Sequence, residues 1–323
     1  LAHDVGAKRG VNYNPDNVAI QPGGKPTIGK FISSIMDPGD EILYPNPGYP
    51  IYESQIEYQG GKAVPYSFVQ TDMGFDIDIQ KLNDSITDRT VALIYNNYQN
   101  PISAESSKKE MEAIAKIAIE NDLWVLSDEA YFEIVYDGDA TSIVSLPGMK
   151  ERTVILYTFS KKFAMTGWRV GGSIGPREII KRIAKLNVNA ESCTTHFIQN
   201  AMVEALNGDQ TGSQKILEKL KVRRDATVKG LNAIDGIDIV APRTTFYLFP
   251  NVTKVMERKG LHKIEDLQNG ALTNANVSFC TREHFGRAQA DDSDYYIRLA
   301  YSGISVEDIN EGLIKLKDFF ESQ

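Results

Sequence analysis

Short apolar runs alternate with helical stretches along the first half of the chain. Each run is three to five residues long, is rich in β-branched or aromatic side chains, and leads into polar or turn-forming residues. The five runs are residues 18–20, 41–44, 91–95, 123–127 and 154–157. Runs of this kind are typical of buried parallel strands that end in loops.

Helical patterns fill the intervals between these runs. The clearest covers residues 108–121, where apolar side chains recur along one face. Strands that alternate with helices predict a doubly wound α/β domain. In such a domain the ligand site is expected at the carboxyl ends of the strands.

The pattern changes after Arg177. The elements predicted there are long helices over 178–206 and 214–232, short strands over 245–249 and 295–299, and an amphipathic helix over 306–320. We therefore interpret residues 1–207 as a large domain and residues 208–323 as a smaller α+β domain.

Composition and charge narrow the class of protein. The chain has 323 residues, of which 42% are hydrophobic and 24% charged, as in ordinary globular proteins. Its net charge of −8 disfavours nucleic acid or an anionic membrane as the main partner. No run of about 18 apolar residues occurs, so no membrane span is predicted.

Cysteine usage adds a further limit. The two cysteines, Cys193 and Cys280, are far apart in the sequence and fit no Cys-x-x-Cys spacing. That argues against a disulfide framework and against a cysteine-rich zinc site. We expect a protein of the reducing cytoplasm that holds no metal.

The strongest chemical signal is the pair Lys161-Lys162. These lysines follow a predicted buried strand and precede an apolar turn punctuated by glycine. A buried lysine is unusual without a task, and desolvation lowers its pKa toward the neutral amine that forms imines. Two exposed lysines at the start of a helix are the alternative, and composition alone does not separate the two interpretations.

The wording of residues 160–171, Ser-Lys-Lys-Phe-Ala-Met-Thr-Gly-Trp-Arg-Val-Gly, does separate them. It resembles the cofactor-lysine signature of the class I/II aminotransferases, which are aspartate aminotransferase-like enzymes of fold type I. The resemblance continues in register from about Val11 to Phe320. It implies pyridoxal 5'-phosphate (PLP) as cofactor and a mostly parallel seven-stranded sheet between helices. The family lysine lies eight residues before the phosphate-binding arginine, which selects Lys161 with Arg169 and not Lys162.

The resemblance also assigns residues around the cofactor ring. Asp128 matches the aspartate that pairs with the pyridine nitrogen, although an aspartate just after a strand is also a common helix N-cap. Tyr131 and Asn100 match the residues that hydrogen-bond the cofactor's 3-hydroxyl. Tyr49 matches the aromatic residue that stacks on the ring, with ordinary core packing as its alternative.

Phosphate and substrate contacts follow in the same way. The family's phosphate loop aligns with Gly23-Gly24-Lys25, which precedes a predicted helix whose N-terminus favours an anion. Hydroxyls of Thr158 and Ser160 and the guanidinium of Arg169 complete this set. Arg298 matches the arginine that grips the substrate α-carboxylate, with Asn100 beside it. Its alternative is a surface arginine on an edge strand.

The implied reaction moves an amino group between an L-amino acid and a 2-oxo acid, for which 2-oxoglutarate is expected. Lys161 would form a Schiff base with the cofactor, act as general base, and give ping-pong kinetics. A homodimer with active sites at the subunit interface is expected. Aromatic residues that fit either a substrate pocket or ordinary packing are Phe246, Tyr247, Tyr13, Tyr52 and Tyr98.

Two other functions remain open on the same fold. One is β-elimination by a cysteine-conjugate lyase, which would release pyruvate and ammonia without a keto acid. The other is the effector domain of a transcription regulator, which would carry a basic DNA-binding domain ahead of this chain. A nicotinamide dehydrogenase is disfavoured, because no Gly-x-Gly-x-x-Gly follows a strand.

The chain departs from the family in two places. Family members carry several tens of residues before this starting point, including an N-terminal arm and a tyrosine that reaches the neighbouring subunit's cofactor. We therefore expect that an N-terminal segment is missing from this sequence. The usual Asn-Pro-Thr-Gly also reads Asn100-Pro101-Ile102-Ser103. Serine in place of glycine puts in question the loop conformation that glycine permits, and with it the shape of the substrate pocket.

Overall fold

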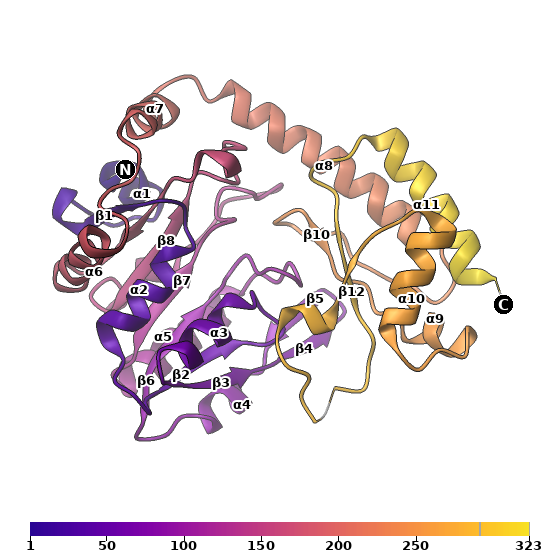
Figure 1. The fold of residues 1–323 in the computed structure, drawn as a ribbon, viewed down its shortest axis with the longest axis horizontal. Helices are drawn as coiled ribbons and strands as arrows, with labels where there is room; N and C mark the ends of the chain where they lie inside the picture. Colours follow the sequence, from indigo (N-terminus) through magenta and orange to yellow (C-terminus); the bar gives the residue numbers. More distant parts are fainter. Residues whose placement is uncertain (291, 323) are drawn as a thin grey trace.

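A seven-stranded sheet is the largest element of the computed structural model, which describes residues 1–290 and 292–322 (Figure 1). Its strand order is β1-β9-β8-β7-β6-β2-β3. In that order the strands are Val18–Gln21, Gly171–Ile174, Thr153–Thr158, Trp124–Asp128, Thr90–Tyr95, Glu41–Pro45 and Lys62–Tyr66. Strands β8, β7, β6, β2 and β3 pair in parallel, whereas β9 is antiparallel to both neighbours. The predicted α/β class with a mostly parallel seven-stranded sheet is confirmed.

All five apolar runs are strands, but the predicted parallel pairing is wrong for the first. Strand β1 lies at the sheet edge and pairs antiparallel with β9, which the sequence analysis missed. Strand β9 reads Gly171-Gly172-Ser173-Ile174, so only its last residue is β-branched and the usual strand signal is weak. Glycine is needed there, because a Cβ on Gly171 would lie 2.5 Å from the carbonyl oxygen of Tyr157. The edge strand β3 was also missed, since it contains a proline and a lysine.

Helices cover both faces of this sheet. One face packs against α2 (Pro26–Ile35), α3 (Ile51–Tyr58) and α6 (Arg177–Ala190). The other packs against α1 (Ala2–Lys8), α4 (Ile79–Asp84), α5 (Lys108–Glu120) and α7 (His196–Asn207). Neighbouring strand residues such as Leu93 and Ile94 belong to opposite clusters, as a period of two requires. Burial on both faces explains why the strands read as continuous apolar runs.

The helix predicted over 178–206 is wrong as a single element. The structure has α6 and α7 instead, with a break at residues 191–195. This stretch reads Glu-Ser-Cys-Thr-Thr, and its threonines are poor helix formers. Ser192 adopts a left-handed φ of 63°, and the ammonium of Lys30 binds Glu191 at 2.5 Å, which fixes the end of α6.

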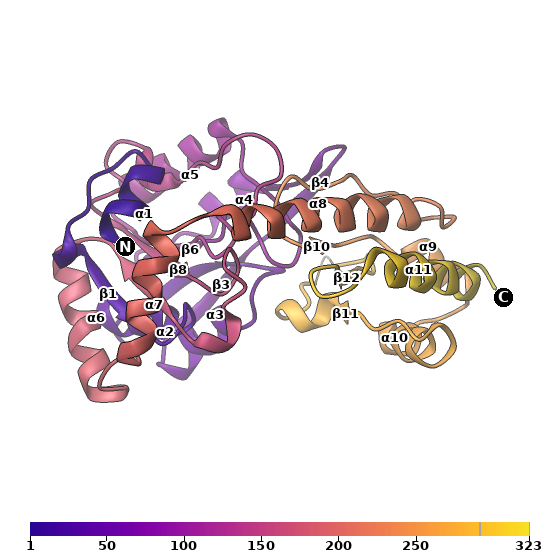
Figure 2. The same ribbon diagram turned by 90° about the horizontal axis from the view of Figure 1, so that it is seen from above.

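The C-terminal part lies beside the sheet and is reached through the long helix α8 (Figures 1 and 2). Its helices are α8 (Thr211–Leu231), α9 (Thr253–Arg258), α10 (Ile264–Gly270) and α11 (Val306–Glu321). Its three-stranded antiparallel sheet has the order β10-β12-β11, formed by Tyr247–Leu248, Ile297–Ala300 and Cys280–Thr281. Both strands predicted in this part are present but shorter. A hairpin, β4 (Phe68–Thr71) with β5 (Gly74–Ile77), projects from the sheet part toward it.

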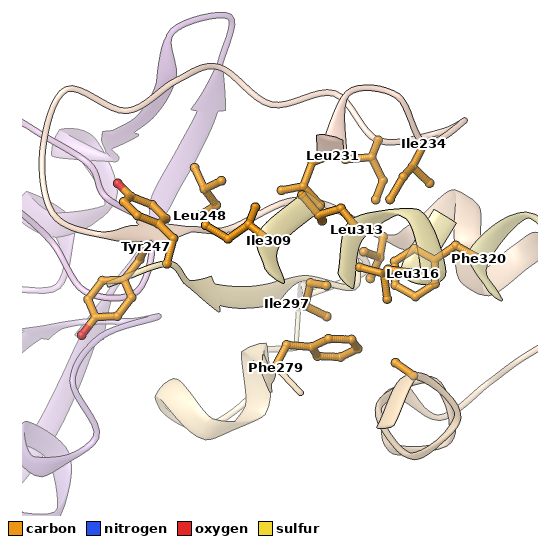
Figure 3. Close-up of a cluster of buried hydrophobic side chains, with 14 of the residues drawn as sticks. Leu231, Ile234, Tyr247, Leu248, Phe279, Ile297, Ile309, Leu313, Leu316 and Phe320 are labelled. Atoms are coloured by element: carbon orange, nitrogen blue, oxygen red, sulfur yellow. The ribbon is translucent and has the colours of Figure 1, made fainter. Parts of the chain in front are cut away.

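One hydrophobic cluster forms the core of the C-terminal part. Figure 3 shows Leu313, Leu316 and Phe320 of α11 packed toward Leu231 of α8 and Ile297 of β12. The cluster also takes in residues of the sheet part, which are Tyr98, Tyr131, Phe132, Ile134 and Tyr136. We propose that residues 208–323 form a second, smaller domain that shares this packed boundary with the first. None of the helices within 1–290 and 292–322 is long and apolar enough to cross a membrane.

Candidate active site

A cavity of about 610 Å³ lies at the carboxyl ends of the parallel strands, where the fold class places a ligand. Of the twelve predicted site residues, eleven line it: Gly24, Lys25, Tyr49, Asn100, Asp128, Tyr131, Thr158, Ser160, Lys161, Arg169 and Arg298. Gly23 does not line the cavity, and it lies against the guanidinium of Arg169. A larger cavity of about 840 Å³, between the β4–β5 hairpin and residues 238–249, contains none of the twelve.

The two adjacent lysines have different surroundings. Lys162 forms an ion pair of 2.8 Å with Glu133, which also binds Lys8. Lys161 lines the cavity, and within the described residues it makes no such ion pair; its Nζ lies 5.3 Å from the ring centroid of Tyr131. Burial, reinforced by the positive charges of Arg298 and Arg169, lowers the pKa of Lys161 against the opposing effect of Asp128. These surroundings make the neutral amine of Lys161 easier to form than that of an exposed lysine.

Asp128 ends β7 and is buried in the wall of the cavity. The hydroxyl of Tyr52 donates a hydrogen bond of 2.6 Å to its Oδ2, and the amide of Ala130 donates one of 3.1 Å to its Oδ1. Burial raises the pKa of Asp128, while these two hydrogen bonds oppose the rise. The alternative role as a helix N-cap is wrong, because residues 130–133 form turns and not a helix.

Arg298 lies on β12, the central strand of the small sheet, so the edge-strand alternative is wrong. Its Nη1 donates a hydrogen bond of 2.7 Å to Oδ1 of Asn100. Its guanidinium carbon lies 4.3 Å from the ring centroid of Tyr247, whose hydroxyl is 2.6 Å from that of Tyr131. The Nε of Arg298 is buried without a hydrogen-bond partner among the described residues. A buried charged donor with unused capacity fits a bound carboxylate.

The turn before α2 is shaped around Arg169. Gly23 has φ of 104°, and a Cβ on it would lie 2.2 Å from Nη2 of Arg169. The positive φ favours glycine, and a side chain here would also displace the guanidinium of Arg169. Arg169 also donates a hydrogen bond of 2.7 Å to the carbonyl of Thr166. The hydroxyl oxygens of Thr158 and Ser160 are 2.9 Å apart. Cationic, hydroxyl and backbone donors at one end of a cavity form a donor set that fits a phosphate group.

Several cavity residues were not assigned a role from the sequence. Tyr52 and Tyr247, two of the five aromatic residues with alternative interpretations, line the cavity, whereas Tyr13, Tyr98 and Phe246 are not part of its lining. Other lining residues were not singled out, and Asn96 is the most informative of them. Its side chain donates a hydrogen bond of 2.9 Å to the carbonyl of Asp128 and accepts one of 3.2 Å from the amide of Asn100. It therefore joins the ends of β6 and β7. Its position directly after a buried strand was the available signal.

Comparison with known proteins identifies the family of the chain. Residues 1–316 match the family model described as aminotransferase class I and II. The chain belongs to the class I and II aminotransferase family. This aminotransferase is 33% identical over 310 residues to a putative aminotransferase, YugH, of Bacillus subtilis (strain 168), covering 96% of this chain and 77% of the relative.

Other relatives of this aminotransferase differ in their named substrates. An aspartate aminotransferase of Bacillus sp. (strain YM-2) is 30% identical over 311 residues, covering 96% of this chain and 77% of the relative. A solved aromatic aminotransferase from Pyrococcus horikoshii OT3 superimposes with a TM-score of 0.90 at 31% identity, covering 98% of this chain and 83% of that one. The fold is therefore fold type I, and the protein is a PLP-dependent transferase.

The contact between Tyr52 and Asp128 leads to a prediction about pH. Tyr52→Phe removes a hydrogen bond that stabilises ionised Asp128, so the pKa of Asp128 should rise further. A hydrogen bond to a charged group contributes roughly 1.5–3 kcal/mol, so the acid limb of kcat/KM should move up by about one pH unit or more. The measurement is the pH profile of kcat/KM for the best donor amino acid. Tyr66→Phe removes an equally buried hydroxyl, bonded to the carbonyl of Ile94, and should leave the limb in place.

Proposed function

We propose that this aminotransferase transfers the amino group of an L-amino acid to a 2-oxo acid, with 2-oxoglutarate as acceptor, by a ping-pong mechanism. The observation that carries the proposal is one cavity that combines three groups. They are a partly buried lysine of lowered pKa (Lys161), a buried carboxylate (Asp128), and an arginine with an unused buried donor (Arg298).

The residues of the cavity fit PLP by their chemistry. We assign its phosphate to Arg169, Thr158, Ser160, Lys25 and the turn Gly23-Gly24. We assign its pyridine nitrogen to Asp128, its hydroxyl to Asn100 and Tyr131, its ring face to Tyr49, and its covalent attachment to Lys161. When bound, the cofactor supplies an electron sink that lets the α-carbon of the substrate lose its proton.

The chain's own residues divide the remaining work. Arg298 offers the planar, bidentate donor pair that suits the α-carboxylate. Lys161, whose pKa burial lowers, takes the α-proton at its Nζ as general base and returns a proton later. Asp128, whose ionised form the hydroxyl of Tyr52 stabilises with a hydrogen bond, places a carboxyl group in the wall of the cavity.

A single-turnover experiment tests the proposal. Holoenzyme is mixed with each amino acid of a panel, without any keto acid, and the released 2-oxo acid is quantified. The donor should give about one equivalent of 2-oxo acid per chain and then stop, because a ping-pong enzyme must be reset by the second substrate. Adding 2-oxoglutarate should restart the reaction and form glutamate.

The same assay separates the alternative chemistry. A cysteine S-conjugate that yields pyruvate and ammonia continuously, without a keto acid, identifies a β-elimination lyase instead. If no amino acid gives a 2-oxo acid from cofactor-loaded protein, the proposal fails. The named substrates of relatives, aspartate and aromatic amino acids, define the first members of the panel.

We also propose that the protein is a homodimer with active sites at the subunit interface. Helices α6 and α7 expose large apolar side chains, with Val188 at 69%, Phe197 at 71% and Val203 at 58% exposure. Exposed apolar side chains that gather on neighbouring elements are typical of protein–protein contacts. Trp168, which directly precedes Arg169 in the sequence, is also half exposed.

The two cysteines bear on the cellular location of the protein. Both Cys193 and Cys280 are free thiols in the structure. Free thiols without a disulfide are typical of reducing compartments. We therefore propose that the protein acts in the cytoplasm.

A further inference from the structure

Two buried residues with left-handed backbone face each other across the boundary between the sheet part and the C-terminal part. Ser103 has φ of 57° and Thr245 has φ of 64°. Glycine adopts this region freely, whereas a β-branched residue such as threonine is found there only as an outlier. Thr245 is fully buried and Ser103 nearly so. Something in the structure must offset the strain at both positions.

A closed ring of hydrogen bonds provides that compensation. The amide of Tyr247 donates a hydrogen bond of 3.2 Å to Oγ1 of Thr245. The hydroxyl oxygens of Thr245 and Ser103 are 2.6 Å apart, and the hydroxyl of Ser103 donates a hydrogen bond of 2.9 Å to the carbonyl of Tyr247. A carbonyl only accepts, so the single Ser103 proton goes to Tyr247 and Thr245 donates to Ser103. Each hydroxyl therefore gives one hydrogen bond and accepts one. We call Ser103, Thr245 and the Tyr247 backbone the hydroxyl clasp.

The hydroxyl clasp sits between two other links of the same loop. The side chain of Asn100 accepts a hydrogen bond of 2.7 Å from Arg298. Both carboxylate oxygens of Glu105 bind the guanidinium of Arg243, and one of them lies 2.8 Å from its Nε. Three positions of one loop of the sheet part thus bind the C-terminal part. The middle link is the one that reaches the backbone of a cavity residue.

Tyr247 connects the clasp to the site. Its hydroxyl is 2.6 Å from that of Tyr131, and its ring lies against the guanidinium of Arg298. Fixing the Tyr247 backbone therefore restrains the side chains assigned to the cofactor hydroxyl and to the substrate carboxylate.

We propose that Ser103 and Thr245 are positioning residues, which hold the C-terminal part against the sheet part so that Arg298 is set for the substrate carboxylate before the substrate arrives. This role rests on the proposed function of Arg298. Preorganisation of a binding group lowers the cost of binding, so its loss should raise KM much more than it lowers kcat.

The backbone of Thr245 is held independently of its hydroxyl. Its amide donates 3.0 Å to the carbonyl of Ile134, and its carbonyl accepts from the hydroxyl of Tyr136. Thr245→Val keeps the shape and the branching and removes only the hydroxyl, so it should fold. Thr245→Ser keeps the hydroxyl and removes the branching, which makes it the matched control.

The experiment compares these two variants and Ser103→Ala in two ways. In the cofactor-free full chain, hydrogen–deuterium exchange of the peptide containing Tyr247 should be faster by about tenfold in Thr245→Val and Ser103→Ala, and unchanged in Thr245→Ser. In the holoenzyme, Thr245→Val should raise KM for the donor amino acid by about tenfold with kcat within about twofold, and Thr245→Ser should retain the KM.

Either measurement can overturn the proposal. If the peptide containing Tyr247 exchanges at the wild-type rate in both Thr245→Val and Ser103→Ala, the hydroxyl clasp does not restrain this strand. A loss of kcat at unchanged KM, or an equal effect of Thr245→Ser, would show that the hydroxyl does not position Arg298. If the wild-type protein transfers no amino group, the proposed function fails, and the exchange result alone decides whether the clasp exists.

Discussion

Lys161→Ala should abolish transamination. The variant loses both the amine that attaches the cofactor and the base at the α-carbon. General acid–base catalysis alone contributes about 10²–10⁴-fold, so kcat should fall by at least about 10⁴-fold when covalent attachment is lost with it. The measurement is kcat of cofactor-loaded protein, together with mass spectrometry after borohydride treatment, which should find cofactor on the wild-type peptide containing residue 161.

Lys162→Ala is the matched control for this prediction. The two lysines are adjacent, but Lys162 is bound to Glu133 and does not line the cavity. Its replacement should leave the borohydride adduct in place and change kcat only slightly. An adduct that persists in Lys161→Ala and disappears in Lys162→Ala would refute the assignment.

Arg9→Met should destabilise the protein strongly, although Arg9 lies outside the cavity. Arg9 Nε binds Glu129 at 2.5 Å, and the two side chains are 0% and 1% exposed. Breaking one partner of a buried ion pair leaves an uncompensated charge, which costs about 3–5 kcal/mol. The hydroxyls of Ser127 and Ser142 also bind Glu129 and should keep the loss near the lower figure. Urea denaturation of the cofactor-free protein measures the free energy of unfolding.

A double variant gives a second check, because it removes both charges of the buried pair. The double variant Arg9→Met with Glu129→Gln should be more stable than Arg9→Met alone at neutral pH. A double variant that is less stable by the sum of both single losses would contradict a coupled pair.

The sheet and the site differ in how far the sequence could predict them. The central strands were predictable because burial on both faces leaves uninterrupted apolar runs, and Lys161 and Asp128 stand where those runs end. Strand β9 was not, because close backbone contact there demands Gly171 and removes the usual strand signal. The helix break at 191–195 has two causes, which are weak helix propensity and the contact with Lys30. Only the weak helix propensity can be inferred from the sequence.

Contacts between distant segments explain the remaining misses. Tyr52 binds Asp128 from 76 positions away, and nothing in its local sequence separates this role from packing. The sequence did identify Ser103 as a departure from the expected glycine. It could not show that the left-handed backbone persists, because the compensating partner is Thr245, on another part of the chain.

The cluster that joins the two parts of the fold has a consequence for making chimeras. Five of its aromatic and aliphatic residues, between Tyr98 and Tyr136, come from the sheet part, while the rest come from residue 220 onward. Exchanging residues 208–323 with those of a relative would bring two half-cores of different origin into contact. A recombinant that also carries residues 131–136 from the same parent would keep most of that interface native, so the exchangeable module is discontinuous in sequence.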